Sequence, residues 1–161
     1  MGRDAHARRV ETPGDVPALS ARTAAIVTAA AERIIPATDT PGATHANVTA
    51  FIETMLSGWY PPADRDRFVV GIEELDARAK ELYTRAFIAC NPSEQIALLD
   101  GYDSAVASMR AAQDTAANAQ WFAMLKYLTV WGYCTSEAGM RDTLHTWPIL
   151  MRYDGNAKVG A

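Results

Sequence analysis

The chain has 161 residues, 49% of them hydrophobic and 21% charged, which suits one folded domain with a single sizeable core. Its net charge of −4 leaves no basic surface for phosphates, so a nucleic-acid partner is not expected. No apolar run approaches the roughly 20 residues that cross a bilayer, so we expect no membrane-spanning helix.

Residues 1–20 are interpreted as a leader outside the fold. Arg8 and Arg9 form an arginine pair, but the acidic and proline-bearing stretch Glu11–Pro17 follows where an export signal would have its apolar core. The segment is therefore either a disordered leader or the remnant of an export signal. A helical period dominates after residue 20 and predicts a helical domain over residues 21–141.

The first predicted helix covers Ala21–Ile35, because this alanine-rich stretch carries apolar residues at steps of four. Pro36 ends it. The stretch Pro36–Ala43 holds two prolines, a glycine and short polar residues, all of which favour a loop. Within this loop, we expect the short carboxylate of Asp39 to accept local backbone hydrogen bonds in a turn and not to act as a base.

The next two helices are expected over His45–Leu56, with Thr44 as the N-cap, and over Asp64–Ala89. Residues Asn91–Glu94 are typical of a helix start, with a capping side chain, a proline at the first position and a glutamate at the third. The helix that follows carries its apolar residues at Ile96, Leu99, Ala105 and Met109.

A polar break over Gln113–Asn118 precedes the last predicted helix, which has the heaviest apolar stripe in the chain. Its members are Trp121, Met124, Leu125, Leu128 and Trp131. Beyond it, Thr135–Glu137 is expected to cap a short helical turn that Gly139 ends. Residues 142–161 have no period and are expected to form an extended arm. The pattern predicts an all-α single domain of about five helices with an irregular C-terminal arm.

The residues form no recognisable constellation for catalysis, metal binding or cofactor binding. None of His6, His45 and His145 has a glutamate three residues before it, as the di-iron sites of helical bundles require. Phosphate-binding, dinucleotide-binding and nucleophile-elbow motifs are absent. Cys90 and Cys134 match no haem or zinc spacing, and either form a disulfide or remain reduced and buried. We therefore expect no catalytic residue, metal or cofactor in this chain.

Aromatic side chains concentrate in the C-terminal third of the chain. They are Trp121, Phe122, Tyr127, Trp131, Tyr133, Trp147 and Tyr153. Aromatic residues are enriched at the centres of protein interfaces, which favours a binding surface. Two alternatives stay open: these side chains fill the domain's own core, or Trp121, Met124 and Trp131 line a small-ligand site between helices.

Two segments resemble the signatures of a known family. Residues 34–43, IIPATDTPGA, and residues 131–139, WGYCTSEAG, are similar to signatures of the gluconate 2-dehydrogenase subunit 3 family, in order and at the family's separation. Leu144, Pro148 and Tyr153–Gly155 are similar to its closing pattern, so the resemblance spans roughly residues 20 to 156. Asn156 departs from that pattern, because the family often has a cysteine there.

The resemblance implies a non-catalytic small subunit that stabilises a larger catalytic subunit and escorts it during export to the periplasm. The implied partner is a flavoprotein of the glucose-methanol-choline type, which carries FAD and oxidises sugars, sugar acids or glucosides, as glucoside 3-dehydrogenases do. A c-type cytochrome is the implied electron acceptor in the wider complex. The alternative function is that of a stand-alone helical protein that binds a small ligand.

The interface with the partner is expected to combine the 36–43 loop with residues 131–154, because these parts carry glycine, proline and aromatic residues and the arm has no helical period of its own. The side chains expected to bind the partner are Pro36, Asp39, Pro41, Gly42, Trp131, Tyr133, Ser136, Glu137, His145, Trp147, Pro148, Tyr153 and Asp154. Trp147 and Tyr153 are the expected anchors of the arm.

Overall fold

The computed structural model of the protein describes residues 17–146, and all its regular elements in that range are helical. Its five longer helices are α2 (Ala21–Ile34), α3 (Val48–Gly58), α4 (Pro62–Tyr83), α5 (Pro92–Ala111) and α6 (Trp121–Cys134). The shorter segments are the 3₁₀ helices η1 (Phe87–Ala89) and η2 (Thr115–Ala119) and the π-helical turn η3 (Gly139–Thr143). The predicted all-α class is confirmed. Among the described helices, none is long and apolar enough to cross a membrane.

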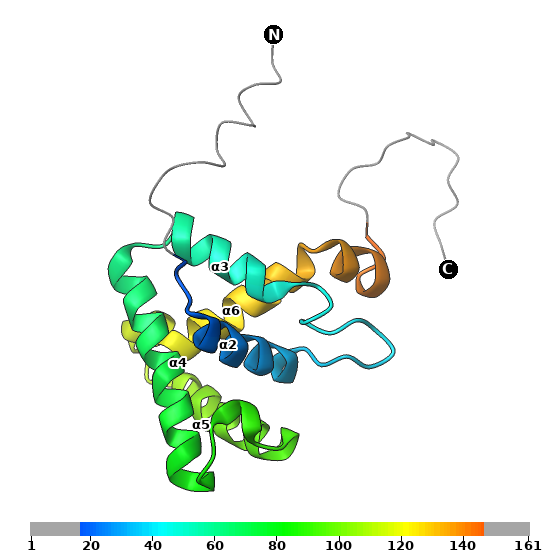
Figure 1. The fold of residues 1–161 in the computed structure, drawn as a ribbon. Helices are drawn as coiled ribbons and strands as arrows, with labels where there is room; N and C mark the ends of the chain where they lie inside the picture. Colours follow the sequence, from blue (N-terminus) through cyan, green and yellow to red (C-terminus); the bar gives the residue numbers. More distant parts are fainter. Residues whose placement is uncertain (1–16, 147–161) are drawn as a thin grey trace, which may run out of the picture.

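Helix α6 lies at the centre of the bundle and contacts α2, α3, α4 and α5. In Figure 1, α3 covers one side of α2 and α6, α4 runs down the left edge, and α5 lies below. The loop that follows α2 and the C-terminal end of α6 lie at the same end of the molecule, on the right in this view. Two segments far apart in the sequence are therefore brought together at that end.

Helix starts follow the local capping rules. The Asn91 side chain accepts a hydrogen bond from the Glu94 amide at 3.0 Å, and the Glu94 carboxylate accepts one from the Asn91 amide at 2.9 Å, which confirms the predicted capping box. At the start of α2, the Ser20 hydroxyl accepts from the Thr23 amide. Leu19 is buried, and the amides of Ala18 and Leu19 donate to Glu53. Residues 17–20 therefore belong to the folded domain, although the prediction assigned them to the leader.

Two predicted helix boundaries, the start of α3 and the end of α4, were wrong. Each is set by a residue in the left-handed conformation and not by the spacing of the apolar residues. Helix α3 begins at Val48 and not at His45, since Asn47 takes a left-handed conformation with a φ of 53° after a series of turns. Helix α4 ends at Tyr83 and not at Ala89, because Thr84 takes a φ of 57° and reverses the chain. A non-glycine residue rarely adopts this conformation, so neither helix end could be predicted from the residue types alone.

Two further expectations also needed correction. Helix α5 buries Leu98, Leu99 and Val106, whereas Ile96 and Ala105 from the predicted stripe are exposed. Gly139 does not end the last helical turn, which continues to Thr143, two residues beyond the predicted boundary of the helical domain. Gly139 instead allows the backbone of this turn to lie close to the end of α6, because a Cβ at this position would overlap the carbonyl oxygen of Tyr133.

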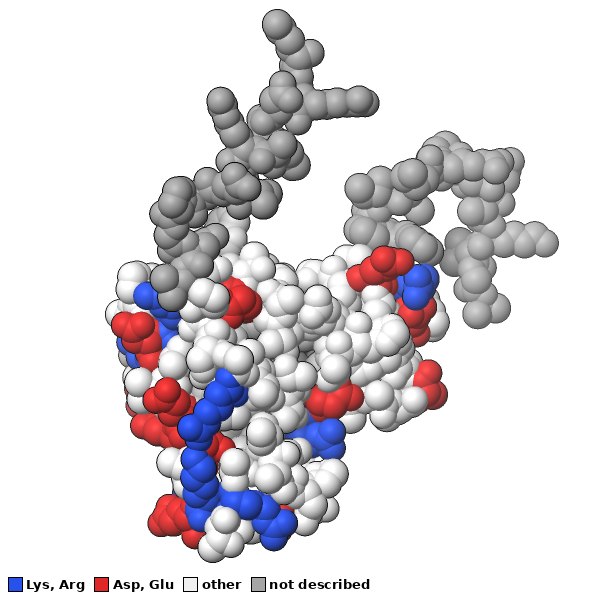
Figure 2. Space-filling model, viewed as in Figure 1, with Lys and Arg blue, Asp and Glu red and all other residues white. Residues whose placement is uncertain are grey.

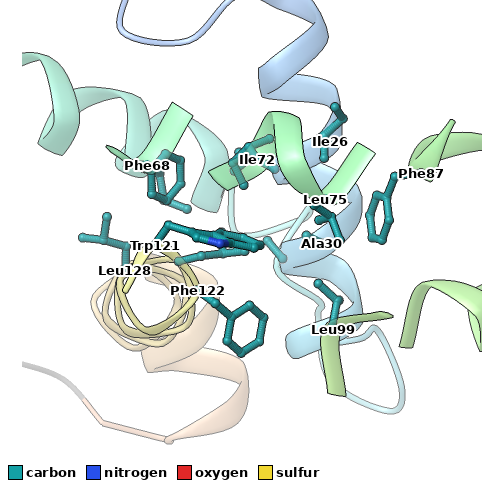
Figure 3. Packing of buried hydrophobic residues seen from close by; sticks show 14 of the residues in the cluster. Ile26, Ala30, Phe68, Ile72, Leu75, Phe87, Leu99, Trp121, Phe122 and Leu128 are labelled. Carbon is teal, nitrogen blue, oxygen red and sulfur yellow. The ribbon is translucent and has the colours of Figure 1, made fainter. Parts of the chain in front are cut away.

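All five longer helices contribute to the core, and Trp121 lies where α4, α5 and α6 meet. Figure 3 shows this indole between Phe68 and Ile72 of α4 on one side and Phe122 on the other. Tyr102 of α5 packs edge-on against it, with the ring centroids 4.8 Å apart. Some of the C-terminal aromatic residues thus do fill the domain's own core.

Both cysteines are free thiols, Cys90 buried and Cys134 half-buried.

Candidate partner interface

The loop after α2 is held in shape by the carboxylate of Glu32, which sits in the last turn of that helix. One carboxylate oxygen accepts a hydrogen bond from the Ala37 amide at 3.0 Å, and the other accepts from the Thr44 amide at 2.8 Å. The Ala43 amide closes the loop by donating to the Ile35 carbonyl at 2.9 Å. A single side chain therefore fixes both ends of the segment that carries the first signature.

The half-buried carboxyl of Glu32 also has a shifted pKa. Burial would raise the pKa of its carboxyl, but the hydrogen bonds from Thr44 and Ala37 outweigh this and lower the pKa below the ordinary value of 4.5. Because the folded-state pKa is the lower one, the stabilisation is present above the unfolded pKa and is lost as the pH falls through the folded one. The loop is thus fully braced at neutral pH.

Gly42 is required by this arrangement. An ideal Cβ at this position would overlap the Glu32 carboxylate and would lie 2.6 Å from the Ala37 nitrogen. Asp39, by contrast, is exposed at the tip of the loop. Its carboxylate accepts a hydrogen bond from the Thr38 hydroxyl at 2.9 Å, and not from a backbone amide as expected. The glycine serves the loop's packing, and the aspartate faces outward.

Tyr133 joins the two signature segments. Its phenol donates to the Pro41 carbonyl at 2.6 Å and shares a second hydrogen bond, at 2.7 Å, with the Thr143 hydroxyl. The side chain is only 4% exposed. Tyr133 was expected to contact a partner, but the structure places it inside this chain's own fold, where it holds the loop against the end of α6.

The turn after α6 is closed by Ser136. Its hydroxyl donates to the Tyr133 carbonyl at 2.7 Å and accepts from the Gly139 amide at 2.9 Å. Glu137 points outward and pairs with Arg141 at 2.9 Å, and Arg141 also pairs with Asp142. The hydrogen bond from Arg141 keeps the pKa of the Asp142 carboxyl below its ordinary value. This end of the molecule therefore carries a small ionised cluster.

The expected interface residues divide into three groups. Those exposed in the structure are Pro36, Asp39, Trp131, Glu137 and His145. Those partly or fully buried are Pro41, Gly42, Tyr133 and Ser136. Those outside the described residues are Trp147, Pro148, Tyr153 and Asp154. The structure brings the loop and the turn after α6 to one end of the bundle, where Tyr133 of the second group holds the two segments together.

The proposed small-ligand site between helices does not assemble. Trp121 is buried in the core, and Trp131 is on the surface. Of the three expected residues, Met124 alone lines the described groove of about 630 Å³ beside α6, together with Tyr60 and Tyr127. Within residues 17–146, no three His, Cys, Asp or Glu side chains are grouped closely enough to hold a metal ion.

Sequence reasoning missed Glu32, although a signal for it existed. An acidic residue in the last turn of a helix is unfavourable, because the helix dipole is negative at that end. Glu32 occupies such a position in α2 and has no acidic counterpart in the first turn. A glutamate placed against the dipole indicates that its carboxylate has another use, which here is to bind the amides of the following loop.

Replacing Tyr133 with phenylalanine should loosen the contact between the two signature segments. The variant keeps the buried ring but loses both hydrogen bonds of the phenol, so we expect a loss of about 1 kcal/mol in the free energy of unfolding. Chemical denaturation followed by circular dichroism measures this change. Tyr127→Phe removes an exposed hydroxyl and is the matched control, which should unfold at the wild-type midpoint. Equal midpoints for all three proteins would contradict the role given to Tyr133.

The chain was compared with known proteins. The family model described as gluconate 2-dehydrogenase subunit 3 matches residues 21–151, which is most of the chain and includes both signature segments. No match was found among curated proteins or among solved structures. This family is a small subunit of a dehydrogenase complex. The protein therefore belongs to the gluconate 2-dehydrogenase subunit 3 family.

Proposed function

We propose that this chain is a non-catalytic subunit that binds and stabilises an FAD-bearing catalytic subunit of the glucose-methanol-choline type. The observation that carries the proposal is the family match over residues 21–151, which makes the chain a subunit of a dehydrogenase complex. The partner oxidises a sugar, a sugar acid or a glucoside, in the last case as a glucoside 3-dehydrogenase. A c-type cytochrome accepts the electrons in the wider complex.

The braced loop supports a binding role. Glu32, Gly42 and Tyr133 hold a loop whose tip, residues 36–39, is exposed and contributes nothing to the chain's own core. A loop that is already ordered loses less conformational entropy when it binds, which raises its affinity for a partner. We infer that residues 36–39 contact the catalytic subunit together with Glu137 and the arm that carries Trp147 and Tyr153.

The proposed stabilisation has a simple thermodynamic basis. A subunit that binds only the folded form of its partner stabilises that form by mass action, by about 2.7 kcal/mol when its concentration is 100 times the dissociation constant. The chain would accompany the catalytic subunit into the periplasm and keep it folded there. Its own part in the reaction is indirect, since FAD and the catalytic residues belong to the partner.

Co-expression with the cognate catalytic subunit should raise the yield of soluble, FAD-loaded catalytic subunit several-fold, because binding removes it from the pool of unfolded chains. Flavin absorbance of the purified fraction, divided by its protein content, measures this yield. The small subunit expressed alone is the control and should carry no flavin absorbance. A catalytic subunit that is equally soluble and equally loaded without its partner would contradict the proposed role.

A further inference from the structure

A row of exposed and half-exposed aromatic side chains follows the contact between α3 and α6. Phe51 packs edge-on against Trp131 with ring centroids 5.2 Å apart, and Tyr127 lies 5.7 Å from Trp131. Tyr127, Met124 and Tyr60 line the neighbouring groove. We call these five residues the aromatic seam. Tyr127 is 58% exposed and Trp131 is 38% exposed, so these two rings lie on the surface, whereas Phe51, Tyr60 and Met124 are partly buried against the core.

The part of the aromatic seam that lies on α3 and α6 is nearly free of charge, whereas the groove at its end is also lined by Asp64, Arg67 and Arg110. Glu53 is the only charged residue of α3, and its carboxylate binds the amides of Ala18 and Leu19. Lys126 is the only charged residue of α6, and it pairs with Asp103 of α5 at 2.8 Å. On the face shown in Figure 2, charged side chains of both signs gather along α4 and around the final turn. Exposed aromatic residues without charges are typical of the centre of a protein interface.

The seam is continuous with the braced end of the molecule. Trp131 lies one helical turn before Thr135, whose hydroxyl donates to the Trp131 carbonyl at 2.8 Å. Thr135 begins the turn that Ser136 closes and that Tyr133 ties to the loop. At its other end the seam opens into the groove of about 630 Å³, which can receive a protruding side chain. One partner surface could therefore cover the loop, the turn and the seam together.

We propose that the catalytic subunit covers the aromatic seam with a face that is apolar opposite the rings of α3 and α6, an inference that rests on the function proposed above. That face offers apolar side chains to the rings and hydrogen-bond acceptors to the Tyr127 hydroxyl and the Trp131 indole. A lipid surface fits less well, because interfacial helices bind anionic headgroups through lysine and arginine, and the basic side chains near the seam have partners within this chain. Lys126 pairs with Asp103, Arg67 of the groove pairs with Asp64, and Arg110 of the groove donates to Asn118.

A pair of matched variants tests this surface. Val130, beside Tyr127 and Trp131, is 44% exposed, and Val70 on α4, which lines a hollow with Arg65 and Asp66, is 52% exposed. Val130→Glu places a charge in the covered seam and should weaken binding of the purified flavin-bearing subunit by about 30-fold or more, as expected at the centre of an interface. Val70→Glu should bind as the wild type does. Tyr127→Ala, which removes an anchor without adding charge, should also weaken binding.

The outcomes separate this inference from the proposed function. Circular dichroism first establishes that each variant is folded. Surface plasmon resonance then measures the affinity of each variant for the purified flavin-bearing subunit. If the wild-type chain binds the flavin-bearing subunit and folded Val130→Glu and Tyr127→Ala bind equally well, the seam proposal is wrong and the function stands. If the wild-type chain does not bind, both are wrong. If the variants abolish only self-association of the isolated chain, a second copy covers the seam and the proposal is also wrong.

Discussion

Replacing Gly71 with alanine should cost about 3 kcal/mol of the free energy of unfolding, a large share of the total for a domain of this size. Helix α4 passes so close to Trp121 that a Cβ on Gly71 would overlap the indole ring. The ring cannot move aside, because Tyr102 and Phe122 pack against its other edges. The overpacking therefore outweighs the gain of roughly 1 kcal/mol that alanine brings to a helix interior.

The matched control for this substitution is Gly101→Ala. Gly101 also lies inside a helix, α5, but a Cβ added there would meet nothing within 4 Å. This variant should gain roughly 1 kcal/mol from helix propensity alone. Urea denaturation of both proteins measures the two changes, which should have opposite signs. Stabilisation of both variants would show that the core around Trp121 has more free space than the structure allows.

The second large effect is expected at Asp76. This buried carboxylate accepts hydrogen bonds from the Phe87 amide at 2.8 Å and from Lys80 at 2.7 Å, and it also pairs with Arg22. Asp76→Ala leaves the buried Phe87 amide without an acceptor and removes two charge-assisted bonds, so we expect a loss of about 3 kcal/mol. Asp76→Asn keeps an acceptor for the amide and should lose less.

The effect of Asp76 should also depend on pH. Burial would raise the pKa of its carboxyl, but the bonds from Lys80, Phe87 and Arg22 lower it below the ordinary value of 3.8. A lowered folded-state pKa means that the stabilisation is present above the unfolded pKa and disappears as the pH falls through the folded one. The difference in unfolding free energy between wild type and Asp76→Ala should therefore be large at neutral pH and shrink in acid. A difference that does not change with pH would contradict this ionic role.

Much of the fold followed from local rules. The capping box at Asn91 and the proline that ends the first helix act through neighbours in sequence, and the structure confirms them. The predicted stripe of α6 is confirmed in part: Trp121, Leu125 and Leu128 are buried, whereas Met124 is half-buried and Trp131 is exposed. The ends of α3 and α4 could not be predicted in this way. They depend on the left-handed residues Asn47 and Thr84 and, after α4, on a distant contact between Asp76 and the Phe87 amide.

The candidate interface was only partly predictable for the same reason. The signature segments themselves were visible in the sequence, but their contact depends on a hydrogen bond between Tyr133 and Pro41, which are 92 residues apart. The sequence alone does not distinguish a buried tyrosine such as Tyr133 from an exposed one such as Tyr127. Only the packing of α6 against α3 separates Tyr133, which holds the loop, from Tyr127 and Trp131, which face outward.

The proposed function requires that this chain bind a flavin-bearing dehydrogenase subunit. Sedimentation velocity of the two purified wild-type chains, followed by the flavin absorbance, measures this binding. We expect the flavin boundary to move to a faster-sedimenting species when the small subunit is added, and Val130→Glu to shift it less. A flavin boundary that stays at the position of the catalytic subunit alone, with the folded small subunit sedimenting separately, would show that the proposed function is wrong.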